Sequence, residues 1–263
     1  MTTPVLILHA PGTNRDREAA WACQRAGGAP DIVRLGAVLA GEVALDDYGM
    51  LVFPGGFSFG DDLGAGKLWA AWMGSACGDD LLRFVARGRP VLGICNGFQV
   101  LVKTGLLPGP LDEDDAPLTP TVTLTRNDSA RFECRWVRLR PQPDSPCVFT
   151  KGLEEDILCP VAHGEGRLVF GEPALRERAK ALGLAALRYV ARDGGPAAYP
   201  DNPNGSADDI AGLTNAAGNV LGLMPHPEDH ILPRQNPRAS RGATGHLGLG
   251  LFRNGLRHAA ETN

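Results

Sequence analysis

A five-residue turn constrains this chain more than any other feature of its sequence. Residues 93–97 read Gly-Ile-Cys-Asn-Gly and stand between an apolar run that ends at Leu92 and a second apolar run, 98–102. A nucleophile with a small residue two positions away on each side, at a strand-to-helix turn, is the nucleophile-elbow pattern. Such a turn is strained and leaves its neighbours room for almost no side chain, which explains both glycines. The sequence therefore predicts a buried strand, a sharp bend and a helix.

The residue at the predicted bend is Cys95. At a helix N-terminus the unpaired backbone N–H groups carry partial positive charge, which favours a thiolate over a thiol. The alternative is an ordinary buried thiol, which is the commoner role of an isolated cysteine. The two glycines in register favour the nucleophile.

The first hundred residues alternate between apolar runs typical of strands and stretches with helical spacing. Thr13 and Asn14 are expected to cap a helix that begins near Asp16, and Asp79 with Asp80 a later helix. This alternation indicates a parallel sheet with helices on both faces. The strands are expected at 5–9, 31–35 and 49–53, followed by the one that leads into Cys95.

From about residue 118 apolar and polar residues alternate, as in antiparallel strands with one exposed face. Helical spacing returns around Leu251. We therefore expect an α/β fold: an open, mostly parallel sheet with helices on both faces, of flavodoxin-like type, plus a small antiparallel sheet. One domain spanning residues 1–263 is the simplest organisation. The later strands are expected at 121–125, 131–139, 157–161, 167–170, 187–190 and 220–223.

Composition excludes several classes of function. A net charge of −4 argues against nucleic-acid binding, which needs clustered Lys and Arg. No apolar run approaches the roughly 18 residues of a membrane-spanning helix, and the first residues show no basic leader, so we expect a cytoplasmic protein that binds no membrane. The six cysteines form no Cys-x-x-Cys pair, so neither a zinc site nor a disulfide framework is predicted, and no metal is expected.

A cysteine nucleophile needs a base and a group that orients the base. Met-Pro-His-Pro-Glu, residues 224–228, follows the strand predicted at 220–223 and so lies where ligands bind open α/β sheets. Pro227 is expected to hold His226 extended, with Glu228 on the same side and able to hold one tautomer of the ring. The alternative is a Pro-rich surface turn with an incidental histidine; the elbow favours the catalytic interpretation.

Oxyanion donors are expected from backbone N–H groups. One is that of Asn96, the residue after the nucleophile. The other is expected from Pro54-Gly55-Gly56, where glycine permits close backbone approach. Residues 60–68 resemble a P-loop, but the spacing is one residue too long and Leu68 replaces the Mg²⁺-binding hydroxyl, so no nucleotide site is predicted.

With these motifs in place, the chain resembles the class I glutamine amidotransferases, and among them the glutaminase subunits of phosphoribosylformylglycinamidine synthase. The elbow and the His-Pro-Glu triplet alone indicate a glutaminase. The narrower resemblance depends on Pro-Gly-Gly-Phe-Ser (54–58), Ile-Cys-Asn-Gly-Phe-Gln (94–99) and Ala-His-Gly-Glu-Gly-Arg (162–167).

This resemblance implies that Cys95 attacks the side-chain amide of glutamine, forms a glutamyl thioester and releases ammonia, with His226 moving protons and Glu228 orienting it. It also implies that the ammonia passes to a separate synthetase subunit, with a small accessory subunit in the complex. That synthetase would use ATP and Mg²⁺ to convert formylglycinamide ribonucleotide to the amidine in purine biosynthesis, and this chain would need no cofactor. The implied roles are oxyanion binding for Gly56 and Asn96, glutamine binding for Gln99, Arg131 and Phe132, and a position at the partner-facing mouth for His163 and Glu165.

Two alternatives stay open at this point. One is a stand-alone elbow-cysteine hydrolase that acts on peptides or small electrophiles without a partner. The other is a non-catalytic regulator that has kept the fold. Ammonia release from glutamine distinguishes the first, and labelling of Cys95 by a glutamine-like electrophile distinguishes the second.

Overall fold

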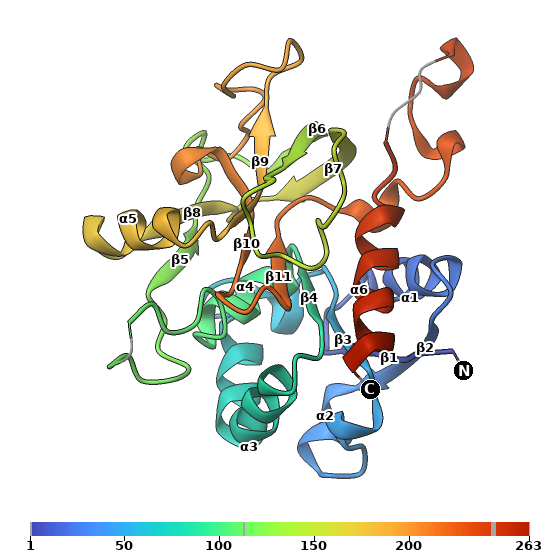
Figure 1. Ribbon diagram of the computed structural model, residues 1–263, viewed down its shortest axis with the longest axis vertical. Helices are drawn as coiled ribbons and strands as arrows, with labels where there is room; N and C mark the ends of the chain where they lie inside the picture. The colour runs from blue at the N-terminus through green and yellow to red at the C-terminus, as the bar shows by residue number, and fades with distance from the viewer. Residues whose placement is uncertain (1, 113, 243–245, 263) are drawn as a thin grey trace.

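The structure is a computed structural model that describes residues 2–112, 114–242 and 246–262. Within those ranges the centre of the molecule is a nine-stranded sheet (Figure 1). In the order in which they lie across the sheet, the first five strands, β2 to β11, pair in parallel, and the remaining pairs are antiparallel. The order across the sheet is β2 (Ala29–Arg34), β1 (Pro4–His9), β3 (Met50–Phe53), β4 (Val91–Ile94), β11 (Val220–Leu223), β10 (Ile210–Thr214), β9 (Ala185–Val190), β6 (Glu133–Pro141) and β7 (Ile157–His163).

Helices cover both faces of the parallel half. α1 (Asp16–Arg25) packs beside α6 (Leu249–Thr262) on one face, and α3 (Lys67–Ala86) beside α4 (Asn96–Lys103) on the other (Figure 1). Every residue of β3, β4 and β11 is therefore buried, which explains their uninterrupted apolar sequences. The other α-helices are the short α2 (Leu35–Leu39) and α5 (Pro173–Ala181), and β5 (Val122–Thr125) and β8 (Arg167–Phe170) form a separate two-stranded sheet. The described residues also form short 3₁₀ helices at Leu45–Asp47, Ser58–Asp61, Ala207–Asp209, Pro227–Asp229, Pro233–Gln235 and Ala239–Arg241.

The predicted fold class is confirmed, with one refinement: most of the antiparallel strands extend the main sheet, and only β5 and β8 form a sheet of their own. Two details are wrong. Asp79 and Asp80 lie inside α3 instead of capping it, because the helix begins twelve residues earlier at Lys67. Arg15, not Thr13 or Asn14, occupies the N-cap position of α1, without a side-chain cap.

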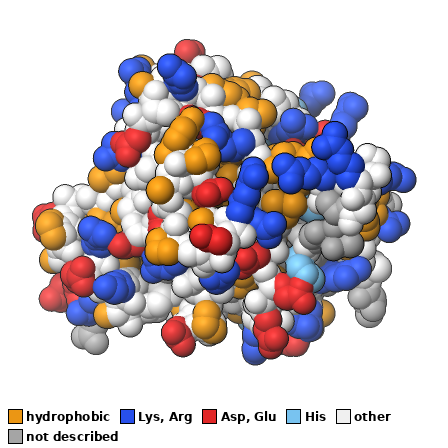
Figure 2. Space-filling view, turned by 90° about the horizontal axis from the view of Figure 1, so that it is seen from above, with side chains coloured by type: hydrophobic (Ala, Val, Ile, Leu, Met, Phe, Trp, Pro, Cys, Tyr) orange, Lys and Arg blue, Asp and Glu red, His pale blue; other side chains and the backbone are white. Residues whose placement is uncertain are grey.

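Charges on the surface are mixed. Figure 2 shows Lys and Arg side chains interspersed with Asp and Glu and with apolar groups on the face seen from above. In the part of the chain that the structure describes, no helix combines the length and the apolar character needed to cross a membrane.

Candidate active site

The elbow forms as the sequence predicts. Cys95 joins β4 to α4 with φ 50° and ψ −104°, a strained conformation for a residue with a side chain. A Cβ on Gly93 would lie 2.5 Å from Leu101 Cδ1, and one on Gly97 would lie 1.8 Å from the carbonyl oxygen of Phe53. Both glycines are therefore required by close packing around the bend.

Parallel pairing of β4 with β11 brings Cys95 and His226, which are 131 positions apart in sequence, to the same edge of the sheet. Ile94 pairs with Leu223, and the backbone N–H of Cys95 donates to the Leu223 carbonyl at 2.8 Å. The segment after β11 carries His226, which packs against the loop after β3: a Cβ on Gly55 would lie 2.7 Å from His226 Cε1. Three strand ends thus converge, as expected for an open α/β sheet.

His226 and Glu228 form a buried pair. His226 Nδ1 lies 2.6 Å from Glu228 Oε1, and the two residues are 3% and 0% exposed. Burial by itself would lower the pKa of His226, but the Glu228 carboxylate and then the Cys95 thiolate raise it well above its ordinary value. The predicted contact is present, but the extended backbone expected for the whole segment is not. Glu228 lies in a 3₁₀ turn, Pro227–Asp229, and His226 precedes that turn with non-helical dihedral angles. The arrangement favours the imidazolium form of His226.

A cavity of about 190 Å³ adjoins Cys95. One water occupies about 30 Å³ of liquid, so the cavity has the volume of about six waters, which suits a ligand of the size of an amino acid. Phe57 and Phe132, with stacked rings 6.3 Å apart and both exposed, line it. The lining residues are Gly56, Phe57, Asp61, Ala65, Cys95, Gln99, Phe132, Ala162, His163, Gly164 and Glu165.

In the part of the chain that the structure describes, neither predicted oxyanion donor has an acceptor for its backbone N–H. Asn96 is the first residue of α4, where a backbone N–H has no intrahelical acceptor. Gly56 is bridged to Thr13 by its neighbours: the Phe57 N–H donates to the Gly12 carbonyl at 3.0 Å, and the Gly55 carbonyl accepts from the Asn14 N–H at 3.4 Å. The N–H of Gly56 itself has no acceptor among residues 2–112, 114–242 and 246–262. The positive φ of Gly56, 146°, together with backbone atoms 2.8 Å from a would-be Cβ, requires glycine there.

The side chains of Asn96 and Gln99 hold the cavity wall. Asn96 Oδ1 accepts from the Ser58 N–H at 3.2 Å, and its Nδ2 donates to Gln99 Oε1 at 2.9 Å. Gln99 Nε2 in turn donates to the carbonyl oxygen of Glu165 at 2.6 Å. These bonds tie α4 to the loop after β3 and to the segment after β7, the two sides of the cavity.

The remaining predicted residues divide into two groups. Phe132, His163 and Glu165 line the cavity, whereas Arg131 has an exposed side chain and is not among the lining residues. His163 is 3% exposed although it lines the cavity, and its expected place near the partner-facing mouth stays a prediction. It ends β7 with its side chain packed inward beside Gly166, where a Cβ would lie 2.6 Å from the ring.

His163 is held neutral and in one tautomer. Burial and the nearby His226 lower its pKa to about 4. Its Nδ1 donates to Asn127 Oδ1 at 3.2 Å, since Asn127 Nδ2 is already used in donating to two carbonyl groups. Its Nε2 is buried and has no hydrogen-bond partner in the described part of the chain. Asn127 and Asp61 contribute to the site without having been predicted from sequence; an acid five positions after Gly56, the predicted oxyanion glycine, was the available signal for Asp61.

No other cysteine shares the setting of Cys95. Burial raises the pKa values of the Cys23, Cys147 and Cys159 thiols, and burial with Asp80 nearby raises that of Cys77. The donor atoms of His226, Glu228 and Asp229 lie within 4.8 Å of one another, a spacing that could hold a metal, but His226 and Glu228 are here hydrogen-bonded to each other.

Comparison with known proteins agrees with this geometry. Residues 2–259 match the family described as CobB/CobQ-like glutamine amidotransferase domain. The chain is 44% identical to the phosphoribosylformylglycinamidine synthase subunit PurQ of Treponema denticola, over 98% of this chain and 99% of the relative, and 41% identical to that of Dehalococcoides mccartyi, over 97% of each. Among solved structures, PurLQS from Thermotoga maritima has a chain that matches with a TM-score of 0.72 at 32% identity, covering 98% of this chain and 99% of that one. The chain therefore belongs to the CobB/CobQ-like glutamine amidotransferases, in the group of the PurQ subunits.

Proposed function

We propose that this chain is the glutaminase subunit of phosphoribosylformylglycinamidine synthase, with Cys95 as nucleophile, His226 as acid and base, and Glu228 as the group that orients His226. The observation that carries the proposal is the buried His226–Glu228 pair beside a cysteine in a strained elbow. Identity of 44% to a PurQ subunit over nearly the whole of both chains supports the substrate and the pathway.

The chemistry proceeds in two steps. The Cys95 thiolate attacks the side-chain carboxamide carbon of glutamine, and the carbonyl oxygen takes up negative charge opposite the N–H groups of Gly56 and Asn96. The imidazolium of His226 gives its proton to the departing nitrogen, the C–N bond breaks, and ammonia leaves a glutamyl thioester. His226, now neutral, takes a proton from water, the resulting hydroxide attacks the thioester, and the C–S bond breaks to release glutamate and the thiolate.

The ammonia is used elsewhere. A separate synthetase subunit, with a small accessory subunit, takes it and uses ATP and Mg²⁺ to convert formylglycinamide ribonucleotide to formylglycinamidine ribonucleotide. The PurLQS structure of Thermotoga maritima supports such a complex. The exposed, stacked Phe57 and Phe132 that line the cavity suit a surface covered by a partner. The chain itself needs no cofactor for a thioester mechanism, residues 1–263 act as one domain, and the cytoplasm is the compartment of the reaction.

The test is ammonia release from glutamine, measured for the chain alone and together with the synthetase subunit from the same cell. We expect release in the complex, coupled to amidine formation. Absence of release in both cases would favour the stand-alone hydrolase of other substrates or the non-catalytic regulator.

A further inference from the structure

Two carboxylates line the Cys95 cavity, and the proposed mechanism uses neither. Asp61 lies in the loop after the oxyanion glycines, and Glu165 follows β7. Both are half-buried, and neither takes part in an ion pair within the residues that the structure describes. Partly buried charges are normally paired. Lys103 is close enough to affect both carboxylates but forms no ion pair with either in the described part of the chain, so the two acids can still accept a cation from a ligand.

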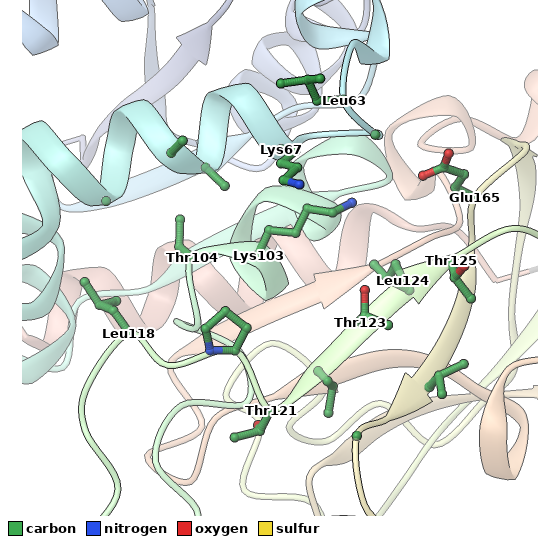
Figure 3. A pocket seen from close by; sticks show the side chains of 18 of the residues that line it. Leu63, Lys67, Lys103, Thr104, Leu118, Thr121, Thr123, Leu124, Thr125 and Glu165 are labelled. Carbon is green, nitrogen blue, oxygen red and sulfur yellow. The ribbon is translucent and has the colours of Figure 1, made fainter.

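The pKa of Asp61 agrees with the lack of an ion-pair partner for its carboxylate. Burial first, and then the Glu165 carboxylate, raise the pKa of Asp61 to about 6, although Lys103 acts in the opposite direction. The Lys103 ammonium instead donates to the carbonyl oxygen of Ala65. Lys103 and Lys67 reach from α4 and α3 into a neighbouring cavity of about 860 Å³, which shares Glu165 with the Cys95 cavity (Figure 3). Both lysines therefore line that second cavity, and neither lines the one that adjoins Cys95.

A third acceptor lines the same cavity. His163 donates through Nδ1 to Asn127, so its Nε2 carries a lone pair, and this buried atom has no partner among the described residues. A neutral imidazole acceptor and two carboxylates in one cavity suit a ligand group that carries several N–H donors and a positive charge.

Glutamine carries such a group. When its amide carbon is at Cys95, its α-ammonium lies at the opposite end of the molecule, further along the cavity. Of the two acids, Asp61 is the more available for it. Glu165 Oε2 already accepts from the Ala65 N–H at 3.3 Å, whereas Asp61 has one long contact, 3.4 Å, from Asn96 Nδ2.

We propose that Asp61, assisted by Glu165, binds the α-ammonium group of glutamine and thereby makes the enzyme specific for an α-amino acid amide. This inference rests on the proposed glutaminase function. It assigns to the loop after β3 a second role besides the oxyanion N–H of Gly56.

The test compares glutamine with glutaramate, which is glutamine without its α-amino group, as substrates of the assembled complex with the synthetase subunit. The wild type should prefer glutamine by at least about tenfold in kcat/KM, the factor for one charge-assisted hydrogen bond. Asp61→Asn should raise KM for glutamine about tenfold or more, leave kcat within about twofold, and leave kcat/KM for glutaramate unchanged. Asp62→Asn removes the adjacent but exposed carboxylate, and serves as the matched control that should change neither substrate.

Several results would overturn the assignment. Equal losses for both substrates in Asp61→Asn would indicate a structural role, and equal use of both substrates by the wild type would exclude an ammonium subsite without any variant. Glu165→Gln provides a second variant, expected to lower the preference less than Asp61→Asn; no change in preference in either variant would also reject the proposal. No ammonia from glutamine with the wild-type complex would reject the glutaminase function and the subsite together, whereas an active but undiscriminating wild type rejects the subsite alone.

Discussion

Gly97 in the first turn of α4 packs against the end of β3 so closely that a Cβ would lie 1.8 Å from the carbonyl oxygen of Phe53. This contact fixes the helix that begins after Cys95 against the strand whose following loop supplies Gly56. Cys95 and Gly56, the proposed nucleophile and oxyanion donor, are therefore positioned by the same backbone contact.

Substitution of Gly97 should be costly for stability. Gly97→Ala forces its Cβ into a backbone carbonyl that cannot rotate away, so we expect a loss at or above the upper end of the roughly 1–3 kcal/mol typical of overpacking. Urea unfolding measures it. Gly74→Ala in α3, where a Cβ would meet nothing within 4 Å, is the matched control and should stabilise the protein by about 0.5–1 kcal/mol. Equal effects of the two substitutions would contradict the close contact.

Cysteine labelling should separate reactivity from exposure. Cys134 is exposed, whereas Cys95 and Cys77 are buried. We expect a simple alkylating reagent to modify Cys134 first, and a glutamine-like diazoketone, which enters the cavity, to modify Cys95; peptide mass spectrometry identifies each site. Modification of Cys77 by the diazoketone, or of no cysteine, would argue against Cys95 as nucleophile.

Removal of that sulfur should separate the two halves of the reaction. Cys95→Ala should abolish glutamine-dependent amidine synthesis by the complex and leave ammonia-dependent synthesis intact, because only the thioester step needs the thiolate. Both rates are measured on the same preparation. Loss of both activities would point to a failure of folding or assembly instead.

Glu228 should affect kcat more than substrate binding. Because Glu228 raises the pKa of His226 against the effect of burial, Glu228→Gln should leave the ring neutral and poorly oriented. We expect glutaminase kcat to fall by about 10²–10⁴-fold, as for other acid–histidine pairs, with KM little changed. Asp229→Asn replaces the neighbouring carboxylate, which lies 3.8 Å from Arg15, and should retain most activity. A comparable loss in both variants would mean that Glu228 has no special role.

His163 should make stability depend on pH. Its folded pKa of about 4 lies below the value near 6.5 of an unfolded histidine, so the unfolded chain binds more protons between those values. The stability that the neutral, buried His163 ring contributes is thus fully present above about pH 6.5. It is lost as pH falls toward 4, and the free energy of unfolding then decreases by about 3 kcal/mol.

Asp61 changes the pH dependence of the unfolding free energy in the opposite direction, because its folded pKa of about 6 lies above its ordinary value and the folded chain therefore binds more protons as pH falls. The informative quantity is therefore the difference in unfolding free energy between wild type and His163→Gln, measured by urea titration from pH 7 to 4.5. That difference should shrink as pH falls. A constant difference would show that His163 titrates normally.

Several parts of the site follow from local sequence alone. The elbow, its two glycines and the strand before it depend on sterics within a few residues, and so they can be read from Gly93 to Gly97. The same holds for the restriction that Pro227 places on His226. The extent of α3 is also visible in the sequence, because Trp69, Met73, Cys77 and Leu81 recur at four-residue spacing on its buried side.

Tertiary structure decided which side chains enter the cavity. The orientation of His163 depends on Asn127, 36 positions earlier, and the loop that carries Asp61 is held by Asn96, 35 positions later. Arg131 and Phe132 are neighbours in sequence, yet only Phe132 lines the cavity. The sequence by itself therefore determined the fold class, the strained turn at Cys95 and the restricted backbone at His226, because these depend on short-range sterics and apolar periodicity. Which acids meet the substrate depends on the paths of loops, which contacts between distant residues fix.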